Sequence, residues 1–254
     1  MLKAVILAAG KGTRMKSKKP KVVHQVMGKP MVYYSIEAAI NAGCEKVCVI
    51  VGYKADEVKQ SVKETYQALG REERLLEQVS YVFQEEQLGT GHAVKCAAEF
   101  IGDDGDLIVL CGDTPLVTAE TLSGAVSQHV LSGNGVTVIS AMLDDPFGYG
   151  RIIRNDKGLS RIVEQKDASE EEQAVKEVNS GMYIFKCSAL NKALDMITND
   201  NAQGEYYLPD TIEIIKEMGY TVDAAVMEDA TQIKGVNTLA QLAEAETIMK
   251  GKLL

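Results

Sequence analysis

The sequence of 254 residues is 46% hydrophobic and carries a formal net charge of -9. This length can bury a full core, as one large α/β domain or as a core domain with an insertion. The negative charge argues against broad binding of nucleic acid, and no stretch is apolar for long enough to span a membrane. The N-terminus lacks a signal-peptide pattern, so we expect a cytoplasmic protein. Five scattered cysteines without a Cys-x-x-Cys pair fit reduced thiols better than disulfides or a zinc site.

The most informative stretch is Leu7–Lys21. An apolar run, Ala4–Leu7, predicts a buried strand, and Gly10 and Gly12 follow it, where glycine lets the backbone turn sharply and approach a ligand. Six cations then fall within eleven residues, and no Asp or Glu occurs before Glu37. Such a loop suits a polyphosphate, because backbone amides cradle oxygens while Lys and Arg neutralise charge. The alternative is a basic loop that only faces solvent.

Two familiar phosphate-binding motifs are absent from this stretch. The P-loop pattern Gly-x-x-x-x-Gly-Lys-Ser/Thr does not occur, and a dinucleotide fingerprint would need a third glycine where the chain has Met15. The acidic ribose ligand expected about 20 residues further on is also missing. A nicotinamide-dependent oxidoreductase is therefore not expected.

The first half of the chain alternates strands and helices. Apolar residues at helical spacing predict a helix over Pro30–Ala42, and the apolar run Lys46–Val51 predicts a second buried strand. Strand, helix and strand in this order indicate a parallel βαβ unit. Further elements expected in this half are a charged helical region at Ala55–Gln78, a strand at Ser80–Phe83, a helix at Ala93–Phe100, a strand at Asp106–Leu110, a helix at Ala119–Leu131 and a strand at Val136–Ala141.

A polar segment precedes the helix that is expected from Ala93. Gly89, Thr90 and Gly91 would place free N–H groups at the N-terminus of that helix, where anions bind. His92 beside them could serve as a base. With three histidines in the chain and no spaced partner, a structural or capping role is the preferred interpretation.

Asp113 follows the predicted strand Asp106–Leu110. In open parallel sheets, ligands bind outside the carboxyl ends of the strands, so this carboxylate would face the same crevice as the glycine loop. A single carboxylate beside a phosphate loop suits Mg²⁺, which completes its shell with water and phosphate oxygens. The alternative is an aspartate that caps the following turn.

The pattern changes in the second half. Gly150–Arg154 and Leu159–Val163 are β-like runs separated by a polar turn at residues 155–158, which predicts a hairpin. Glu164 and Asn179 lie nearby, and glycines with isolated polar residues suit the hydroxyls of a sugar. The remaining expected elements are a strand at Met182–Phe185, a helix at Ser188–Ile197, a helix at Asp210–Met218, a strand at Thr221–Val226 and a helix at Thr238–Lys250.

Several short motifs occur one after another along the chain. They are Leu7–Met15 with Pro20 and Lys21, Gln84, Leu88–Ala93, Cys111–Asp113, Gly148–Arg151, Val163–Asp167, Asn199–Tyr207 and Gly235–Asn237. Together they resemble the sugar nucleotidyltransferases over nearly the whole chain. The Asn199–Tyr207 motif narrows the resemblance to the uridyltransferase (pyrophosphorylase) part of the bacterial bifunctional N-acetylglucosamine-1-phosphate uridyltransferase/glucosamine-1-phosphate acetyltransferases.

The resemblance implies an α/β fold with a Rossmann-like, mainly parallel mixed sheet flanked by helices, and a small β-hairpin-rich insertion that binds the sugar. It implies one nucleotidyltransferase domain over residues 1–254, in which residues 1–143 bind mainly nucleotide, residues 144–237 bind mainly sugar and residues 238–254 form a C-terminal helix. It also implies UTP and N-acetylglucosamine 1-phosphate as substrates, Mg²⁺ as cofactor, and a role in supplying peptidoglycan precursors.

Carried over by position, the resemblance assigns a role to each matched residue. Phosphate contacts and charge neutralisation fall to Arg14 and Lys21, nucleotide recognition to Leu7, Ala8, Ala9, Gly10, Gly12, Gln84, Gly89 and Thr90, sugar contacts to Gly150, Glu164 and Asn179, and Mg²⁺ coordination to Asp113 and Asn237. Two positions depart from the family pattern. Cys111 stands where Tyr is common, and Ser180 where Thr is frequent.

The family's second half is a left-handed β-helix of hexapeptide repeats, and nothing after Asn237 has that period. We therefore expect no acetyltransferase activity, and the oligomeric state stays open because that β-helix mediates trimers in the family. The nearest alternative substrates are glucose 1-phosphate with UTP or dTTP. A non-catalytic nucleotide-binding module is the alternative from another class, and the combination of Arg14, Lys21, Asp113 and Asn237 argues against it.

Overall fold

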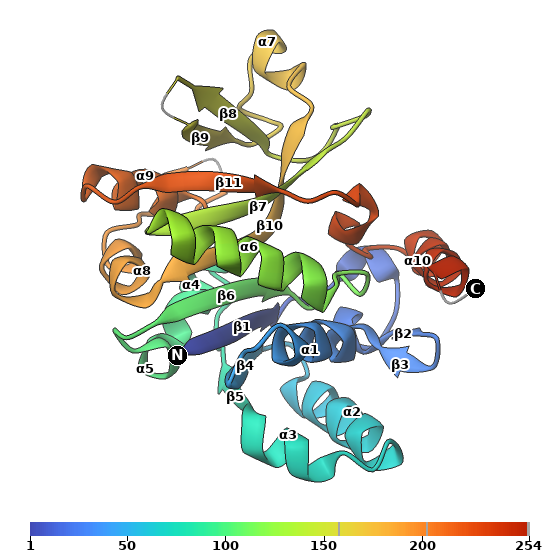
Figure 1. Ribbon diagram of the computed structural model, residues 1–254. Coiled ribbons are helices and arrows are strands. Elements are labelled where there is room, and N and C mark those ends of the chain that lie inside the picture. Colours follow the sequence, from blue (N-terminus) through green and yellow to red (C-terminus); the bar gives the residue numbers. More distant parts are fainter. Residues whose placement is uncertain (157, 202, 253–254) are drawn as a thin grey trace.

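The computed structural model describes residues 1–156, 158–201 and 203–252, and one twisted sheet runs through it (Figure 1). Its strands follow the order β11-β7-β10-β6-β1-β4-β5. They are β1 (Leu2–Ala8), β4 (Lys46–Val51), β5 (Val79–Phe83), β6 (Asp106–Cys111), β7 (Val136–Met142), β10 (Glu177–Lys186) and β11 (Val222–Val226). β1 pairs in parallel with β4 and β6, β4 with β5, and β7 with β11, whereas β10 runs antiparallel between β6 and β7. The expected mainly parallel mixed sheet is confirmed.

Helices cover both faces of the sheet, which is why its strands read as continuous apolar runs. One face packs against α1 (Met31–Asn41), α2 (Ala55–Ala68) and α6 (Ala119–Ser132), and the other against α4 (Thr90–Cys96), α5 (Ala98–Ile101), α8 (Cys187–Leu194) and α9 (Asp210–Glu217). In β1, for example, Ala4 and Ile6 pack in the core on the side of α1, α2 and α6, and Val5 packs in the core on the opposite side. Helices α1 and α6 lie over the face turned to the viewer in Figure 1.

The charged helical region expected over residues 55–78 is confirmed, and it consists of two helices because α2 ends at Ala68, Gly70 turns the chain with a φ of 65°, and α3 spans Glu72–Gln78. Two other helical predictions had the wrong bounds. The helix expected over residues 188–197 ends earlier, at Leu194. The helix expected from Ala93 already begins at Thr90. It also divides at Ala97 into α4 and α5.

Strand β10 is longer than expected. It begins at Glu177 rather than Met182, and a register shift between Asn179 and Met182 interrupts its pairing with β7. At this bulge Gly181 takes a φ of 77°, and the Ser180 hydroxyl donates to the Ile139 carbonyl at 2.5 Å. The bulge breaks the alternation of side chains, so the sequence pattern is lost there.

The expected hairpin is confirmed as β8 (Arg151–Asn155) paired antiparallel with β9 (Gly158–Val163), and it projects from one end of the sheet together with α7 (Glu170–Gln173) (Figure 1). Arg154 anchors it, since its guanidinium donates to the Glu177 carboxylate at 2.7 and 2.8 Å and to Asp223 at 3.1 Å. Lys157 of the predicted turn, Ala202 of the Asn199–Tyr207 motif and residues 253–254 of the predicted last helix lie outside the described residues.

The last helix, α10 (Leu239–Lys252), packs near the start of the chain. It contacts a short hairpin that was not predicted, β2 (Gln25–Val26) with β3 (Lys29–Pro30). Val26, Val236 and Ala245 share one small core cluster there. None of the described helices is long and apolar enough to cross a lipid bilayer.

Candidate active site

The carboxyl ends of β1, β4, β5 and β6 meet at one edge of the sheet, because these strands run parallel. The loops that follow them are joined by backbone hydrogen bonds. The Gly112 N–H donates to the Leu7 carbonyl at 3.0 Å, and the Tyr53 N–H donates to the Ala9 carbonyl at 3.1 Å. The glycine loop is thus fixed against its neighbours on both sides.

Four of the predicted site residues converge at this edge. The Lys21 Nζ atom lies 2.5 Å from Asp113 Oδ2 and 3.1 Å from Asn237 Oδ1, and Arg14 Nη2 lies 2.8 Å from the same Asn237 oxygen. The side chains of Lys21 and Asp113 are only 18% and 15% exposed, so the charges are partly removed from water. We call this group the cation–acid cluster.

Local structure explains how the cluster forms. Lys21 begins the short 3₁₀ helix η2 (Lys21–Val23), and buried Val22 and Val23 fix its backbone. Gly12, with a φ of 66°, passes so close that a Cβ there would overlap the Cβ of Lys21. On the other side, the Val236 N–H donates to the Asp113 carbonyl at 2.9 Å, which brings the segment before α10 to the end of β6.

The cluster fits a Mg²⁺ ion by its donor chemistry. A carboxylate oxygen and an amide oxygen both face one ammonium nitrogen, so two hard oxygen donors already converge on one cation. Among the described residues, no group of three or more His, Cys, Asp or Glu side chains could hold a metal. A site with few protein ligands is what Mg²⁺ uses beside phosphates, because waters and phosphate oxygens fill the rest of its shell.

Gln84 lies at the end of β5 on the same edge. Its backbone N–H donates to the Val51 carbonyl at 2.8 Å, and the residue is only 3% exposed. The Gln84 Nε2 atom lies 3.3 Å from the Gly89 carbonyl oxygen and 3.1 Å from His92 Nδ1. The structural role preferred for His92 agrees with this contact.

The Gly89–Gly91 segment differs in part from its prediction. The Gly91 N–H is not free for an anion, because it donates to the Tyr206 carbonyl at 2.8 Å. Gly89 takes a φ of 108°, and a Cβ there would overlap the Tyr206 backbone. The Thr90 hydroxyl accepts a hydrogen bond from the Leu208 N–H at 3.1 Å. The segment is therefore held by residues 206–208, which lie more than 100 positions further along the chain. The sequence pattern could not predict these contacts.

The three predicted sugar contacts come together in the second half. The Asn179 N–H donates to the Gly150 carbonyl at 2.9 Å, and a Cβ at Gly150 would lie 3.0 Å from Glu164 Oε1. The Asn179 amide is held by Tyr183, whose hydroxyl accepts from Nδ2 at 2.7 Å. This group adjoins the end of β6, because the Cys111 thiol lies 3.7 Å from the Gly181 carbonyl.

The electrostatics of this region raise the pKa of the Glu164 carboxyl above its ordinary value. The main cause is reduced contact with water, and the Asp167 and Asp210 carboxylates add repulsion that Arg151 partly offsets.

Arg151 is a residue of this region to which the sequence assigned no role. It is 1% exposed, and its guanidinium donates to the Tyr149 carbonyl, to Gln165 Oε1 at 2.7 Å and to the Gln173 carbonyl at 3.4 Å. Gln165 Oε1 also accepts from the Gly148 N–H at 3.0 Å. Arg151 therefore ties the loop before Gly150 to the segment that carries Glu164. The burial of Arg151 could not be predicted from the sequence, because an arginine at the start of a hairpin is normally exposed to solvent.

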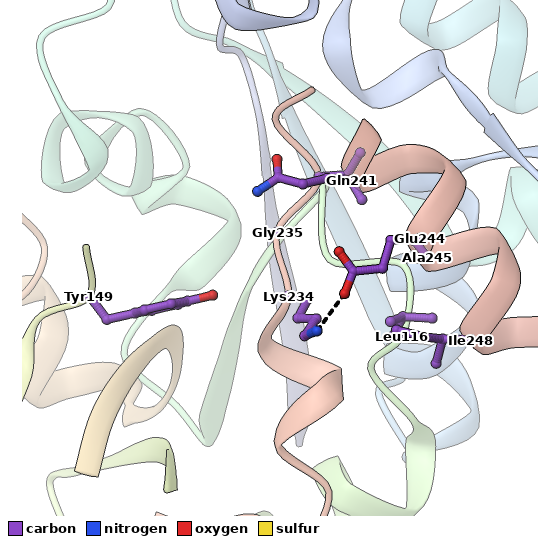
Figure 2. A pocket seen from close by; sticks show the side chains of 9 residues that line it. Leu116, Tyr149, Lys234, Gly235, Gln241, Glu244, Ala245 and Ile248 are labelled. Carbon is purple, nitrogen blue, oxygen red and sulfur yellow. Dashed lines mark hydrogen bonds and ion pairs between the residues drawn. The ribbon is translucent and has the colours of Figure 1, made fainter. Parts of the chain in front are cut away.

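A pocket of about 220 Å³ lies between this loop and α10. Figure 2 shows the side chains that line it. The ring of Tyr149 points across it toward the chain at Lys234 and Gly235, and Lys234 pairs with Glu244 at 2.6 Å. The chain continues from Gly235 to Asn237, so the pocket lies beside the cation–acid cluster. The loop before Gly150 thus lies across this pocket from the segment that leads to Asn237, whose side-chain oxygen joins that of Asp113 in the cation–acid cluster.

A glycine loop, two cations and a carboxylate–amide pair at the carboxyl edge of this sheet define an α/β enzyme that handles phosphates of nucleotides. The chain belongs to the nucleotidyl transferase family, whose model matches residues 3–234. It is 51% identical over 253 residues to the bifunctional protein GlmU of Caldanaerobacter subterraneus subsp. tengcongensis and 49% identical to that of Thermoanaerobacter pseudethanolicus. Each match covers 99% of this chain and 52% of the relative, so the chain spans about half the length of these relatives.

Solved structures share the fold. The crystal structure of UDP-glucose pyrophosphorylase complexed with UDP-glucose has a TM-score of 0.78 at 20% identity and covers 98% of both chains. The apo form of a UDP-glucose pyrophosphorylase has a TM-score of 0.79 at 21% identity over 100% of both chains. The predicted fold class is confirmed.

Proposed function

We propose that the chain transfers UMP from UTP to N-acetylglucosamine 1-phosphate, which forms UDP-N-acetylglucosamine and releases pyrophosphate. The observation that supports this most directly is the cation–acid cluster at the carboxyl edge of the sheet. Family membership supports nucleotidyl transfer as the reaction class. The motif resemblance to the bifunctional uridyltransferase/acetyltransferases supports both the uridylyl group and the N-acetylated sugar. The product would serve as a donor for glycosyl transfer into peptidoglycan.

The reaction is an in-line displacement at phosphorus. A phosphate oxygen of the sugar 1-phosphate attacks the α-phosphorus of UTP, the new P–O bond forms, and the bond to the β-phosphate oxygen breaks as pyrophosphate leaves. The attacking oxygen is already anionic at neutral pH, so no general base is needed. Catalysis then consists of alignment and neutralisation of charge.

The chain's own residues supply that alignment and charge. Backbone N–H groups between Leu7 and Gly12 would contact the nucleotide, and Arg14 would bind its phosphates. Lys21 would neutralise the sugar phosphate and the charge that grows as the two phosphates approach. Because the Lys21 side chain is only 18% exposed, its charge acts with less screening than a surface lysine.

Asp113 and Asn237 would hold Mg²⁺. When bound there, the ion supplies positive charge and Lewis acidity to phosphate oxygens of both substrates. The convergence of the two side-chain oxygens on Lys21 Nζ supports this assignment.

We further propose a division of labour along the chain. Residues 1–143 would bind mainly nucleotide, with Gln84, Gly89 and Thr90 at the base, and residues 144–237 would bind mainly sugar. Gly150, Glu164 and Asn179 would contact the N-acetylated sugar, and their proximity to one another supports a common subsite. Glucose 1-phosphate is the second candidate acceptor, which the fold likeness to UDP-glucose pyrophosphorylase favours.

Pyrophosphate release tests the proposal. UTP and Mg²⁺ are incubated with N-acetylglucosamine 1-phosphate or with glucose 1-phosphate, beside an EDTA control and the Asp113→Asn variant. Metal-dependent release with the N-acetylated sugar, lost in the variant, is the expected result. Release with glucose 1-phosphate alone would keep the reaction class but overturn the sugar assignment, and no release with either sugar would overturn the function.

A further inference from the structure

The side-chain amide of Gln84 is held by two acceptors. Its nitrogen lies 3.3 Å from the Gly89 carbonyl oxygen and 3.1 Å from His92 Nδ1. An amide NH₂ group has two N–H donors, and both are engaged by these contacts. With the amide in this orientation its nitrogen can only donate, so His92 Nδ1 accepts in the tautomer that carries the ring proton on Nε2.

The amide oxygen of Gln84 has no hydrogen-bond partner among the described residues. This atom, Oε1, does not belong to the fully enclosed polar atoms that lack a partner. The residue as a whole is 3% exposed, and because the oxygen is not enclosed, it is an atom of Gln84 that a ligand at the strand edge can reach. An acceptor that is not enclosed and has no protein partner favours a ligand that brings an N–H or O–H group.

His92 is itself held in place. It lies on α4, whose first turn is fastened by the Gly91 N–H to the Tyr206 carbonyl at 2.8 Å and by the Leu208 N–H to the Thr90 hydroxyl at 3.1 Å. The other ring nitrogen, Nε2, lies 3.9 Å from Cys96 Sγ. The position of Nδ1 is therefore set by the fold rather than by the ligand.

We propose that His92 is a positioning residue that fixes the Gln84 amide with its oxygen toward the base, so that the site selects uracil over cytosine. The inference rests on the proposed function, because it takes the nucleotide to be UTP. Uracil carries an N–H donor at N3, which Gln84 Oε1 accepts. Cytosine carries a bare acceptor at N3, which this oxygen repels. A turned-over amide would reverse the preference, but its oxygen would then face the Gly89 carbonyl oxygen, and His92 would have to move its ring proton to Nδ1.

Three variants separate this role from simple packing. His92→Leu removes the acceptor. His92→Asn retains one, because Asn Oδ1 is as many bonds from the backbone as His Nδ1. Cys96→Ala is the matched control, since it changes only the contact of the opposite ring nitrogen. For each protein, kcat and KM are measured with UTP and with CTP at saturating sugar 1-phosphate.

We expect His92→Leu to reduce the selectivity for UTP, measured as kcat/KM with UTP divided by kcat/KM with CTP, by about tenfold or more. The reason is that the Gln84 amide can then turn over, so that the hydrogen bond between its oxygen and N3 of uracil is lost. The change should lie mainly in KM for the nucleotide, because the base is remote from the reacting phosphorus. His92→Asn should restore most of the ratio, and Cys96→Ala should leave it unchanged. An equal loss with UTP and CTP in His92→Leu would overturn the inference.

Equilibrium binding of UTP and CTP, measured by calorimetry without sugar phosphate, keeps this test apart from the proposed function. If the wild-type chain binds UTP over CTP but transfers no uridylyl group, the function fails while the base-selection role is still tested by binding. If His92→Leu does not fold, His92→Asn decides the matter together with His92→Gln. Gln carries its acceptor one bond further away and should lose selectivity, and retention of full selectivity by His92→Gln would overturn the inference.

Discussion

Replacing Lys21 by Met removes one positive charge from the cation–acid cluster and keeps most of the apolar stem. The neighbours Val22 and Val23 are buried and stay in place, so the backbone of η2 should not move. The substitution therefore acts mainly on Asp113 and Asn237, whose side-chain oxygens lie 2.5 and 3.1 Å from the Lys21 ammonium group. We expect the main consequence in turnover rather than in substrate affinity.

The size of the effect follows from the exposure of the charge. Lys21 is 18% exposed, so a value between bulk water and the dry interior applies, and two unit charges about 4 Å apart interact by about 4 kcal/mol at an effective dielectric constant of about 20. Part of this interaction energy is already present when the substrates are bound but have not yet reacted, and that part does not affect kcat. A loss of about 10²- to 10³-fold in kcat, or about 3–4 kcal/mol, is therefore expected, as for one preorganised donor to a developing charge.

The assay measures kcat and KM for UTP and for the sugar phosphate in Lys21→Met and in a control, Lys18→Ala. Lys18 lies on the same loop, is exposed and makes no ion pair among the described residues. The control should stay within about twofold of wild type, because exposed charges contribute little. A change confined to KM for UTP in Lys21→Met, or equal losses in both variants, would refute the reasoning.

The same substitution has a consequence that does not depend on activity. The Lys21 ammonium faces both oxygens proposed to hold the metal. Lys21→Met should therefore strengthen Mn²⁺ binding, followed by the electron paramagnetic resonance of free Mn²⁺ without substrates. Weaker binding in this variant would contradict the metal assignment.

Three further outcomes are expected. Asp113→Asn should lower Mg²⁺-dependent turnover by about 10²-fold or more with an unchanged circular dichroism spectrum, and unchanged rates would refute its metal role. Gly89→Ala should lower the free energy of unfolding by about 1–3 kcal/mol in urea titrations, because its φ of 108° and the adjoining Tyr206 backbone leave no room for a Cβ. The same substitution at Gly70, where nothing adjoins the added atom, should cost less. Burial raises the pKa of the Cys44 thiol to about 12, so alkylation of the native protein at pH 8 should leave it unmodified, as judged by peptide mass.

The local elements could be predicted because each carries its own periodic pattern. Lys46–Val51 has the bounds expected of it, and the hairpin formed by β8 and β9 was expected from two short runs around a polar turn. The bulge in β10 escaped prediction because Ser180 and Gly181 break the alternation on which strand prediction depends. The gap between α2 and α3 likewise follows from one glycine turn in an otherwise helical stretch.

The site was predictable in part from residue type. The sequence places Asp113 after a buried strand and Lys21 in a basic glycine loop, and the rule for parallel sheets brings both to one edge. Asn237 was reached only through the family resemblance, since its hydrogen bond to Lys21 joins residues 216 positions apart. Arg151 lies in the matched motif Gly148–Arg151, but its burial and its structural role were not predicted, because a charged residue in a short strand normally indicates solvent exposure.

The sequence by itself determined the order of strands and helices, the phosphate-type loop and the family, since these depend on local pattern and motif order. The tertiary structure decided which polar atoms are already occupied. It directs the Gly91 N–H to Tyr206 and both N–H donors of Gln84 to Gly89 and His92, and it leaves one oxygen for a ligand. Hydrogen-bond partners across long separations depend on how the elements pack, and packing is a property of the whole chain.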